Sequence, residues 1–122
     1  MTALLVLLGG AIGAPARYLT DLYVREWTGA DFPWGTMVVN AVGSLVLGLL
    51  AGAASSGVLP GWVLPLAGTG FCGALTTFST FSYETVRLAE DGRWRSAALN
   101  VLGSLAVGTV AVSLGWLIGS TL

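Results

Sequence analysis

The residues best suited to chemistry lie in one short segment of the chain, between Gly68 and Glu84. Three glycines are followed there by five hydroxyl side chains with two phenylalanines among them, in the order Gly68, Gly70, Gly73, Thr76, Thr77, Phe78, Ser79, Thr80, Phe81 and Ser82. Clustered glycine and hydroxyl residues favour a broken helix, whose free carbonyl oxygens suit a small cation and whose free N–H groups attract an anion. We therefore expect an ion site near Gly73 to Thr77, and the alternative is a helix that is merely kinked.

Only neutral polar groups are available to an ion in the middle of the apolar segments. The chain has no lysine and no histidine, and no arginine or carboxylate lies centrally in an apolar segment. A proton or cation relay therefore lacks its usual groups. What remains is the amide of Asn40, the hydroxyls, and the positive ring edges of Phe78 and Phe81, which can face a small, strongly hydrated anion. Two phenylalanines three residues apart are also compatible with simple packing.

The composition indicates which elements must position these groups. The chain has 122 residues, of which 55% are hydrophobic and 9% charged, and its mean hydropathy is +0.84. A soluble domain usually carries about 25% charged residues. Four segments have the length of roughly 20 residues that a membrane span needs: residues 2–23, 33–54, 62–83 and 96–120. We predict a single all-α integral membrane domain over residues 1–122, with four transmembrane helices of which the third is broken near its middle.

Several classes of protein are excluded by the same numbers. A net charge of -1 excludes a basic nucleic-acid binder, and the single cysteine, Cys72, excludes an internal disulfide. Without histidine there is no His-based catalysis or zinc site. We therefore predict that the chain is not an enzyme and has no catalytic residues. The first apolar run could also be a cleaved leader, but no Lys or Arg precedes it, so we expect a retained first helix.

An internal repeat relates the second and fourth segments. Residues 40–48 recur as residues 100–108, with Asn, Gly, Ser, Leu and Gly in register. The offset spans two segments, so both copies cross the membrane in the same direction. Each copy includes a polar stripe at helical spacing, formed by Thr36, Asn40 and Ser44 and by Ser96, Asn100 and Ser104. Such a stripe either binds a neighbouring helix or lines a wet path, and the sequence leaves open which asparagine does more.

Three motifs together resemble those of the Fluc (CrcB) fluoride channels. The first contains Gly9, Gly10, Gly13, Ala14, Arg17 and Tyr18, and the second Gly35, Thr36, Val39, Asn40, Gly43 and Ser44. The third, and most specific, runs from Gly70 to Gly73 and continues through Thr76 to Ser82 and Glu84. The resemblance covers the whole chain, including its length and the number of apolar segments.

The resemblance implies a function and a role for particular residues. It implies a fluoride-specific channel in the cell (plasma) membrane that passively exports fluoride from the cytoplasm and so reduces its toxicity. The pore-lining residues would be Asn40, Phe78, Phe81, Thr36, Ser82 and Ser104, with Arg17 and Glu84 at the vestibule. A structural sodium ion, which is not transported, would be held by backbone carbonyls at Gly73 and Thr76.

The resemblance also implies an antiparallel, dual-topology dimer with two narrow pores along the subunit interface. All five arginines lie on the side of the first and third connections. The positive-inside rule therefore favours one orientation, whereas an antiparallel homodimer needs both. The partner is then either a second copy of this chain or an oppositely oriented paralogue. The expected partners are fluoride, membrane lipid and this second subunit, with no nucleic acid.

Three other interpretations compete with a channel. A small multidrug-type secondary transporter needs a membrane-embedded carboxylate, and the only candidate, Glu84, lies at the end of a predicted span. A non-conducting assembly subunit would explain the glycines but not the hydroxyl and phenylalanine cluster. An intramembrane enzyme would need an activated nucleophile, and Cys72 has no evident activating base.

Overall fold

The computed structural model describes residues 1–28 and 32–122, and every regular element in these ranges is helical. The elements are α1 (Thr2–Thr28), α2 (Trp34–Ser55), η1 (Leu64–Cys72), α3 (Gly73–Leu75), α4 (Ser79–Glu90) and α5 (Trp94–Ser120). The prediction of an all-helical protein is confirmed.

Three helices in the described part of the chain are long and apolar enough to cross a bilayer: Thr2–Trp27, Trp34–Ser55 and Trp94–Ser120. Much of their apolar surface faces outward, as for Leu7 at 69% exposed and Leu102 at 67%. In water, a surface of this kind would aggregate, whereas in lipid it is the ordinary outer face of a helix. The protein is therefore an integral membrane protein.

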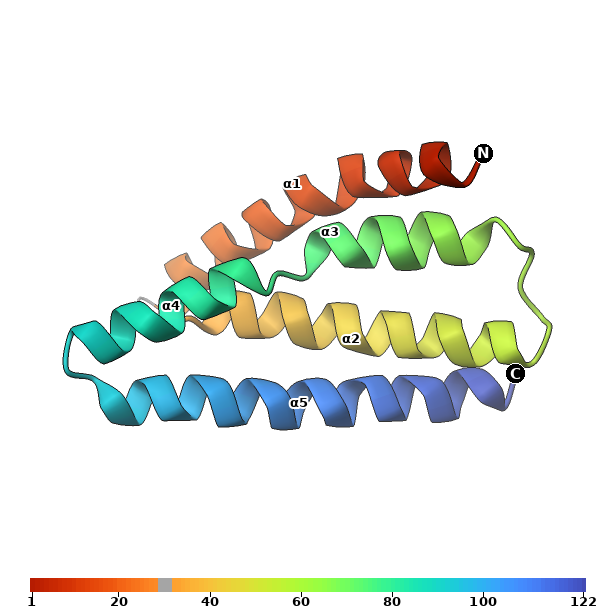
Figure 1. The fold of residues 1–122 in the computed structure, drawn as a ribbon. Coiled ribbons are helices and arrows are strands. Elements are labelled where there is room, and N and C mark those ends of the chain that lie inside the picture. Colours follow the sequence, from red (N-terminus) through yellow and green to blue (C-terminus); the bar gives the residue numbers. More distant parts are fainter. Residues whose placement is uncertain (29–31) are drawn as a thin grey trace.

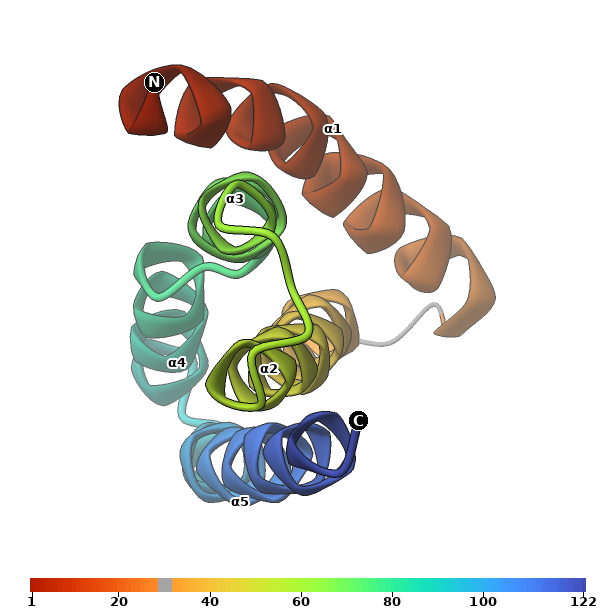
Figure 2. The same ribbon diagram turned by 90° about the vertical axis from the view of Figure 1, so that its right-hand side faces the viewer.

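The helices lie lengthwise in a bundle (Figure 1). Both chain ends lie at the same end of the bundle as the connection between α2 and η1, and the turn between α4 and α5 lies at the opposite end. Viewed down the bundle, α2 lies in the middle, between α5 on one side and the η1 and α3 segment on the other (Figure 2). Among the described residues, α1 packs against η1, α3 and α2, and α4 packs against α5 and α2.

Glycine sets the distance between α2 and α5. A Cβ at Gly48 would overlap the carbonyl oxygen of Val112, and a Cβ at Gly119 would overlap that of Leu49. Gly52 and Gly115 are equally crowded by backbone from the facing helix. Small residues let membrane helices approach closely where no hydrophobic force pushes them together. The two helices consequently form a closely packed pair.

The third apolar segment is irregular in two ways. Its first part, η1, is a nine-residue π-helix, which is unusually long for that rare conformation. The wide η1 turns lie against α1, and the carbonyl oxygen of Leu66 occupies the space where a Cβ on Gly9 would be. The helix then stops at Leu75 and restarts at Ser79, with Thr76 in an extended conformation at ψ 157. The predicted break is present, and it falls at residues 76–78.

Candidate functional site

A groove of about 500 Å³ runs along the break, between α2, the third segment and α5. All the residues that line it are uncharged, as expected for the neutral path predicted from the sequence. The polar residues come from three elements that are distant in sequence: Asn40, Ser44, Thr69, Thr76, Thr77 and Ser104. Gly73, Phe78 and Phe81 line the same groove. The structure thus gathers six of the ten predicted site residues on one surface: Asn40, Gly73, Thr76, Phe78, Phe81 and Ser104.

The side chain of Asn40 holds the broken segment at Thr77. Its Nδ2 donates a hydrogen bond to the Thr77 carbonyl oxygen at 3.1 Å, and its Oδ1 accepts one from the Thr77 N–H at 2.8 Å. A side-chain amide has both a donor and an acceptor, so one residue of α2 satisfies the N–H and the carbonyl of Thr77, which the break leaves without helical partners. The second Nδ2 hydrogen of Asn40 is left for another acceptor, such as an anion in the groove.

The same contacts free two carbonyl oxygens. In an unbroken helix, Gly73 O would accept from the Thr77 N–H and Thr76 O from the Thr80 N–H. Instead, the Thr77 N–H donates to Asn40, and the Thr80 N–H donates to the Thr77 hydroxyl at 3.1 Å. Gly73 is exposed on the groove, and nothing lies within 4 Å of the position that a Cβ would take there. Two hard oxygen ligands are therefore free of their helical donors at the predicted sodium position.

The two phenylalanines meet at the start of α4. Their ring centroids are 5.9 Å apart and the planes are inclined by 43°, a tilted pair. Phe78 is 79% exposed, although it is a large apolar side chain at the break, whereas Phe81 is half-buried. An exposed ring beside an uncharged groove can turn its positive edge toward an anion.

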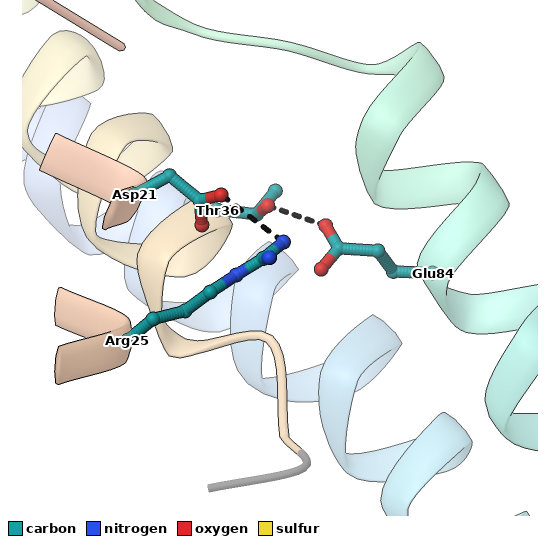
Figure 3. Close-up of polar contacts among 4 residues, drawn as sticks. All are labelled: Asp21, Arg25, Thr36 and Glu84. Carbon is teal, nitrogen blue, oxygen red and sulfur yellow. Dashed lines mark hydrogen bonds and ion pairs between the residues drawn. The ribbon is translucent and has the colours of Figure 1, made fainter. Parts of the chain in front are cut away.

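The remaining two predicted pore residues lie elsewhere. Ser82 is half-buried on α4 and is not among the described residues that line the groove. Thr36 is buried one turn before Asn40 and donates a hydrogen bond to Oε1 of Glu84 (Figure 3). Although Thr36 and Asn40 share a helix face, Thr36 belongs to the charged end of the molecule.

That charged end is a pocket of about 340 Å³ between the end of α1, the start of α2, and α4. Glu84 lies in it, and Arg25 extends toward the carboxylates of Asp21 and Glu84 (Figure 3). The Arg25 to Asp21 ion pair measures 3.2 Å. Glu84 lies one residue beyond the predicted third span. Burial raises the pKa of its carboxyl, the Thr36 hydrogen bond acts in the opposite direction, and the nearby Asp21 and Arg25 charges oppose each other.

A smaller cavity of about 180 Å³ shares lining residues with both the charged pocket and the groove. It is lined by Arg17, Asp21, Thr36, Thr77 and other residues. Asp21 also lines the charged pocket, and Thr77 also lines the groove. The two predicted vestibule residues, Arg17 and Glu84, thus lie in neighbouring cavities, and Thr77 lines both the Arg17 cavity and the groove.

In the described residues, His, Cys, Asp and Glu side chains form no group of three that could hold a metal ion. A cation at this site would need backbone oxygens, and the free carbonyls of Gly73 and Thr76 fit that requirement for a hard ion such as sodium.

Sequence reasoning missed three features of the site. It grouped Thr77 with the other hydroxyl residues and did not identify it as the residue that Asn40 holds. It also missed Asp21 and Arg25, although their i, i+4 spacing on one helix was a readable signal. It missed the π-helix, for which the sequence carries no periodicity that distinguishes it from an α-helix.

Comparison with known proteins agrees with the resemblance to the Fluc (CrcB) fluoride channels. Residues 4–116 match the family model described as CrcB-like protein, Camphor Resistance (CrcB). A protein of Frankia casuarinae named "Fluoride-specific ion channel FluC 1" is 55% identical over 120 residues, which cover 94% of this chain and 93% of the relative. A protein of the same name from Streptomyces avermitilis is 54% identical over 115 residues, with 94% and 93% covered. "Fluoride-specific ion channel FluC" of Magnetococcus marinus is 46% identical over 115 residues, with 93% and 94% covered.

Proposed function

The chain belongs to the CrcB family, and from that membership we infer that it is a fluoride-specific ion channel. The observation that carries this inference is similarity over nearly the full length to relatives named for that activity. The family consists of channels, so the chain is not an enzyme. The uncharged groove supports the inference independently, because an ion crosses it without meeting an oppositely charged side chain that would trap it.

We propose that fluoride moves along the groove past Asn40, Phe78, Phe81 and Ser104. Fluoride is small and costly to dehydrate, so the path must supply close donors in place of water. The free Nδ2 hydrogen of Asn40 and the ring edges of the two phenylalanines are such donors, and Ser104 contributes its hydroxyl group to the wall of the path. Thr36 and Ser82 lie off this surface, and in this proposal they act beside the path.

Arg17 and Glu84 are proposed as vestibule residues. The cavity that Glu84 lines shares Asp21 with the cavity that Arg17 lines, and the Arg17 cavity shares Thr77 with the groove. An arginine at the mouth raises the local concentration of anions without placing a positive charge in the path itself.

A structural sodium ion at Gly73 and Thr76 also belongs to the proposal. Its support is the pair of carbonyl oxygens whose helical donors are engaged by Asn40 and by the Thr77 hydroxyl. A bound cation there would stabilise the break by giving those oxygens a ligand, and it would not move with fluoride.

The working unit is proposed to be an antiparallel dimer, with the broken third segment as a fourth crossing in each subunit. The support is the exposure of the groove along one side of the chain, with Phe78 79% exposed. A second subunit would provide the missing wall and complete a pore. The partner is a second copy or an oppositely oriented paralogue, in the plasma membrane and surrounded by lipid. Such a channel would export cytoplasmic fluoride passively.

Liposome efflux tests this function directly. Purified protein is reconstituted into vesicles loaded with fluoride, and release is followed with a fluoride-selective electrode after a potassium ionophore removes the membrane voltage. We expect rapid fluoride release that needs no proton gradient, with chloride retained in a parallel chloride experiment. Release that requires a proton gradient would instead indicate the multidrug-type transporter, and absence of release would indicate a non-conducting subunit.

The dimer has a separate test. Two differently tagged copies are co-expressed, and cysteines introduced near each terminus are probed with an impermeant thiol reagent. Co-purification with both termini labelled from both sides would support an antiparallel homodimer. Labelling from one side only would rule it out, and if the two tagged copies also failed to co-purify, an oppositely oriented paralogue would be required.

A further inference from the structure

The second asparagine of the repeat, Asn100, is buried more completely than the first. Its exposed fraction is 0%, and it lies on α5 facing α4. Its Nδ2 donates a hydrogen bond of 2.8 Å to the hydroxyl of Thr85, and its Oδ1 accepts one of 3.4 Å from the hydroxyl of Ser104. A fully buried amide is costly unless it is hydrogen-bonded, so these partners fix its orientation.

The hydrogen bonds form a directed chain. The Thr85 hydroxyl has one hydrogen, which it donates to the carbonyl oxygen of Phe81 at 2.8 Å, so it accepts from Asn100. The order is therefore Ser104 to Asn100, Asn100 to Thr85, and Thr85 to the Phe81 carbonyl. Each group in this series donates to the next one. Successive hydrogen bonds of this kind polarise and strengthen one another.

The residues at both ends of this series of hydrogen bonds line the groove. Ser104 and Phe81 line it, whereas Thr85 and Asn100 lie behind its wall. Asn100 thus joins the α5 wall of the groove to the α4 wall. Asn40 differs because it binds backbone at the break and lines the groove directly.

Apolar packing is also present between α4 and α5, beside the hydrogen bond. One turn further along each helix, Leu88 of α4 and Ala97 of α5 are buried at 5% and 6% exposure. The Thr85 hydroxyl bonds the carbonyl four residues earlier, as threonines in helices commonly do, so the bond that distinguishes this arrangement is the one from the buried Asn100 amide to Thr85.

We propose that Asn100 is a positioning residue of the pore, which acts through Thr85 to hold Phe81 and Ser104 at a fixed separation across the groove. This inference rests on the proposed fluoride channel. It gives the two asparagines different tasks: Asn40 fixes the break and faces the ion, and Asn100 fixes the walls on either side of the ion. Selectivity for a small anion depends on that separation. Loss of these hydrogen bonds should therefore weaken the discrimination between fluoride and chloride as well as slow conduction.

The test removes the central hydroxyl with little change of shape. Thr85→Val leaves the Asn100 amide without its acceptor, and Thr85→Ser retains a hydroxyl. Thr20→Val is a matched control, because Thr20 also donates a 2.8 Å hydrogen bond to the carbonyl four residues earlier, Ala16, but no asparagine binds it. Fluoride and chloride release are measured on the same vesicles, so the ratio of the two rates does not depend on the amount of folded protein.

We expect Thr85→Val to slow fluoride release by about tenfold, the change that corresponds to the loss of one buried hydrogen bond, and to lower the fluoride to chloride ratio. Thr85→Ser should recover both to within about twofold, a deviation that the weaker fit of a serine accounts for. Asn100→Leu should resemble Thr85→Val, and the double variant should be no worse than the more severe single variant.

The inference is overturned if Thr85→Val keeps the wild-type ratio, if Thr20→Val changes the ratio equally, or if Thr85→Ser fails to recover it. Failure of the proposed function is distinguishable, because the unmodified protein would then release no fluoride at all.

Discussion

The α2 and α5 pair and the third segment are built in opposite ways. The pair consists of two continuous helices whose backbones touch at glycines such as Gly48 and Gly119. The third segment is part π-helix and part break, and a side chain from α2 satisfies its open backbone. Irregular backbone is tolerated in a membrane only where it is buried in protein or lines a cavity. The regular pair thus acts as a frame that contributes Asn40 and Ser104 to the groove, and the third segment that it supports contributes the open backbone and the two phenylalanines.

Glycine substitutions in the two regions should have the most unequal effects on folding. Gly119→Ala places a methyl group against the Leu49 carbonyl, so the helices must separate, at a cost of about 2 kcal/mol or more. Gly73→Ala points a methyl group into open space and should leave the fold intact. Denaturant unfolding in detergent, followed by tryptophan fluorescence, measures both. Equal destabilisation by the two substitutions would contradict the division into frame and supported segment.

Loss of the hydrogen bonds between Asn40 and Thr77, which link α2 to the third segment, should have the next largest effect, on conduction. Asn40→Leu leaves the N–H and carbonyl of Thr77 unpaired, each at a cost of about 1–3 kcal/mol, so the break should rearrange. We expect fluoride release at least about tenfold slower than for the unmodified protein, since about 1.4 kcal/mol corresponds to tenfold. Thr109→Val removes a polar group from the exposed face of α5 and serves as the control. Normal fluoride release by Asn40→Leu would show that conduction does not need the hydrogen bonds between Asn40 and Thr77.

Phe78 tests the groove without disturbing either region. Its ring is largely exposed, so Phe78→Ile should change the free energy of unfolding by less than about 0.5 kcal/mol. Fluoride release should nevertheless fall severalfold, because the variant has no ring edge to face the ion. Release and unfolding are measured on the same preparation. A variant that unfolds early and conducts normally would assign Phe78 a packing role instead.

The smallest effect is expected at the charged end, from Glu84. Burial raises the pKa of this carboxyl, so its protonated form is favoured on folding and its contribution to stability is greatest at low pH. That contribution is lost as the pH rises from the ordinary pKa near 4.5 through the raised value. Glu84→Gln should remove this dependence. Unfolding midpoints of both proteins across the acid range check it, and parallel curves would contradict it.

Much of the frame was predictable from the sequence, because apolar length and composition mark the long helices. The break was also predictable, since glycine and hydroxyl residues cluster at Gly73 to Thr77. Its position at residues 76–78 was not, because it depends on Asn40 capturing the peptide groups of Thr77 across 37 positions of the chain. Long-range pairing of this kind leaves no local pattern.

The candidate site was predictable to a similar extent. Helical spacing placed Thr36 and Asn40 on one face, and that geometry holds. Asn40, however, meets the Thr77 backbone at the break, whereas Thr36 meets the Glu84 carboxylate of α4. The same spacing paired Asn100 with Ser104 but could not reveal Thr85 as its partner. Periodicity specifies which residues share a face, and only the packing of other helices determines what that face meets.

Current recording in a planar bilayer tests the central claim most directly, namely that an uncharged groove on a supported broken helix conducts fluoride passively and selectively. Fluoride is supplied as a gradient at equal chloride on both sides, and the pH of one side is then varied. The predicted reversal potential equals the fluoride equilibrium potential and does not move with pH. A reversal potential of zero, or one that follows the proton gradient, would contradict the account.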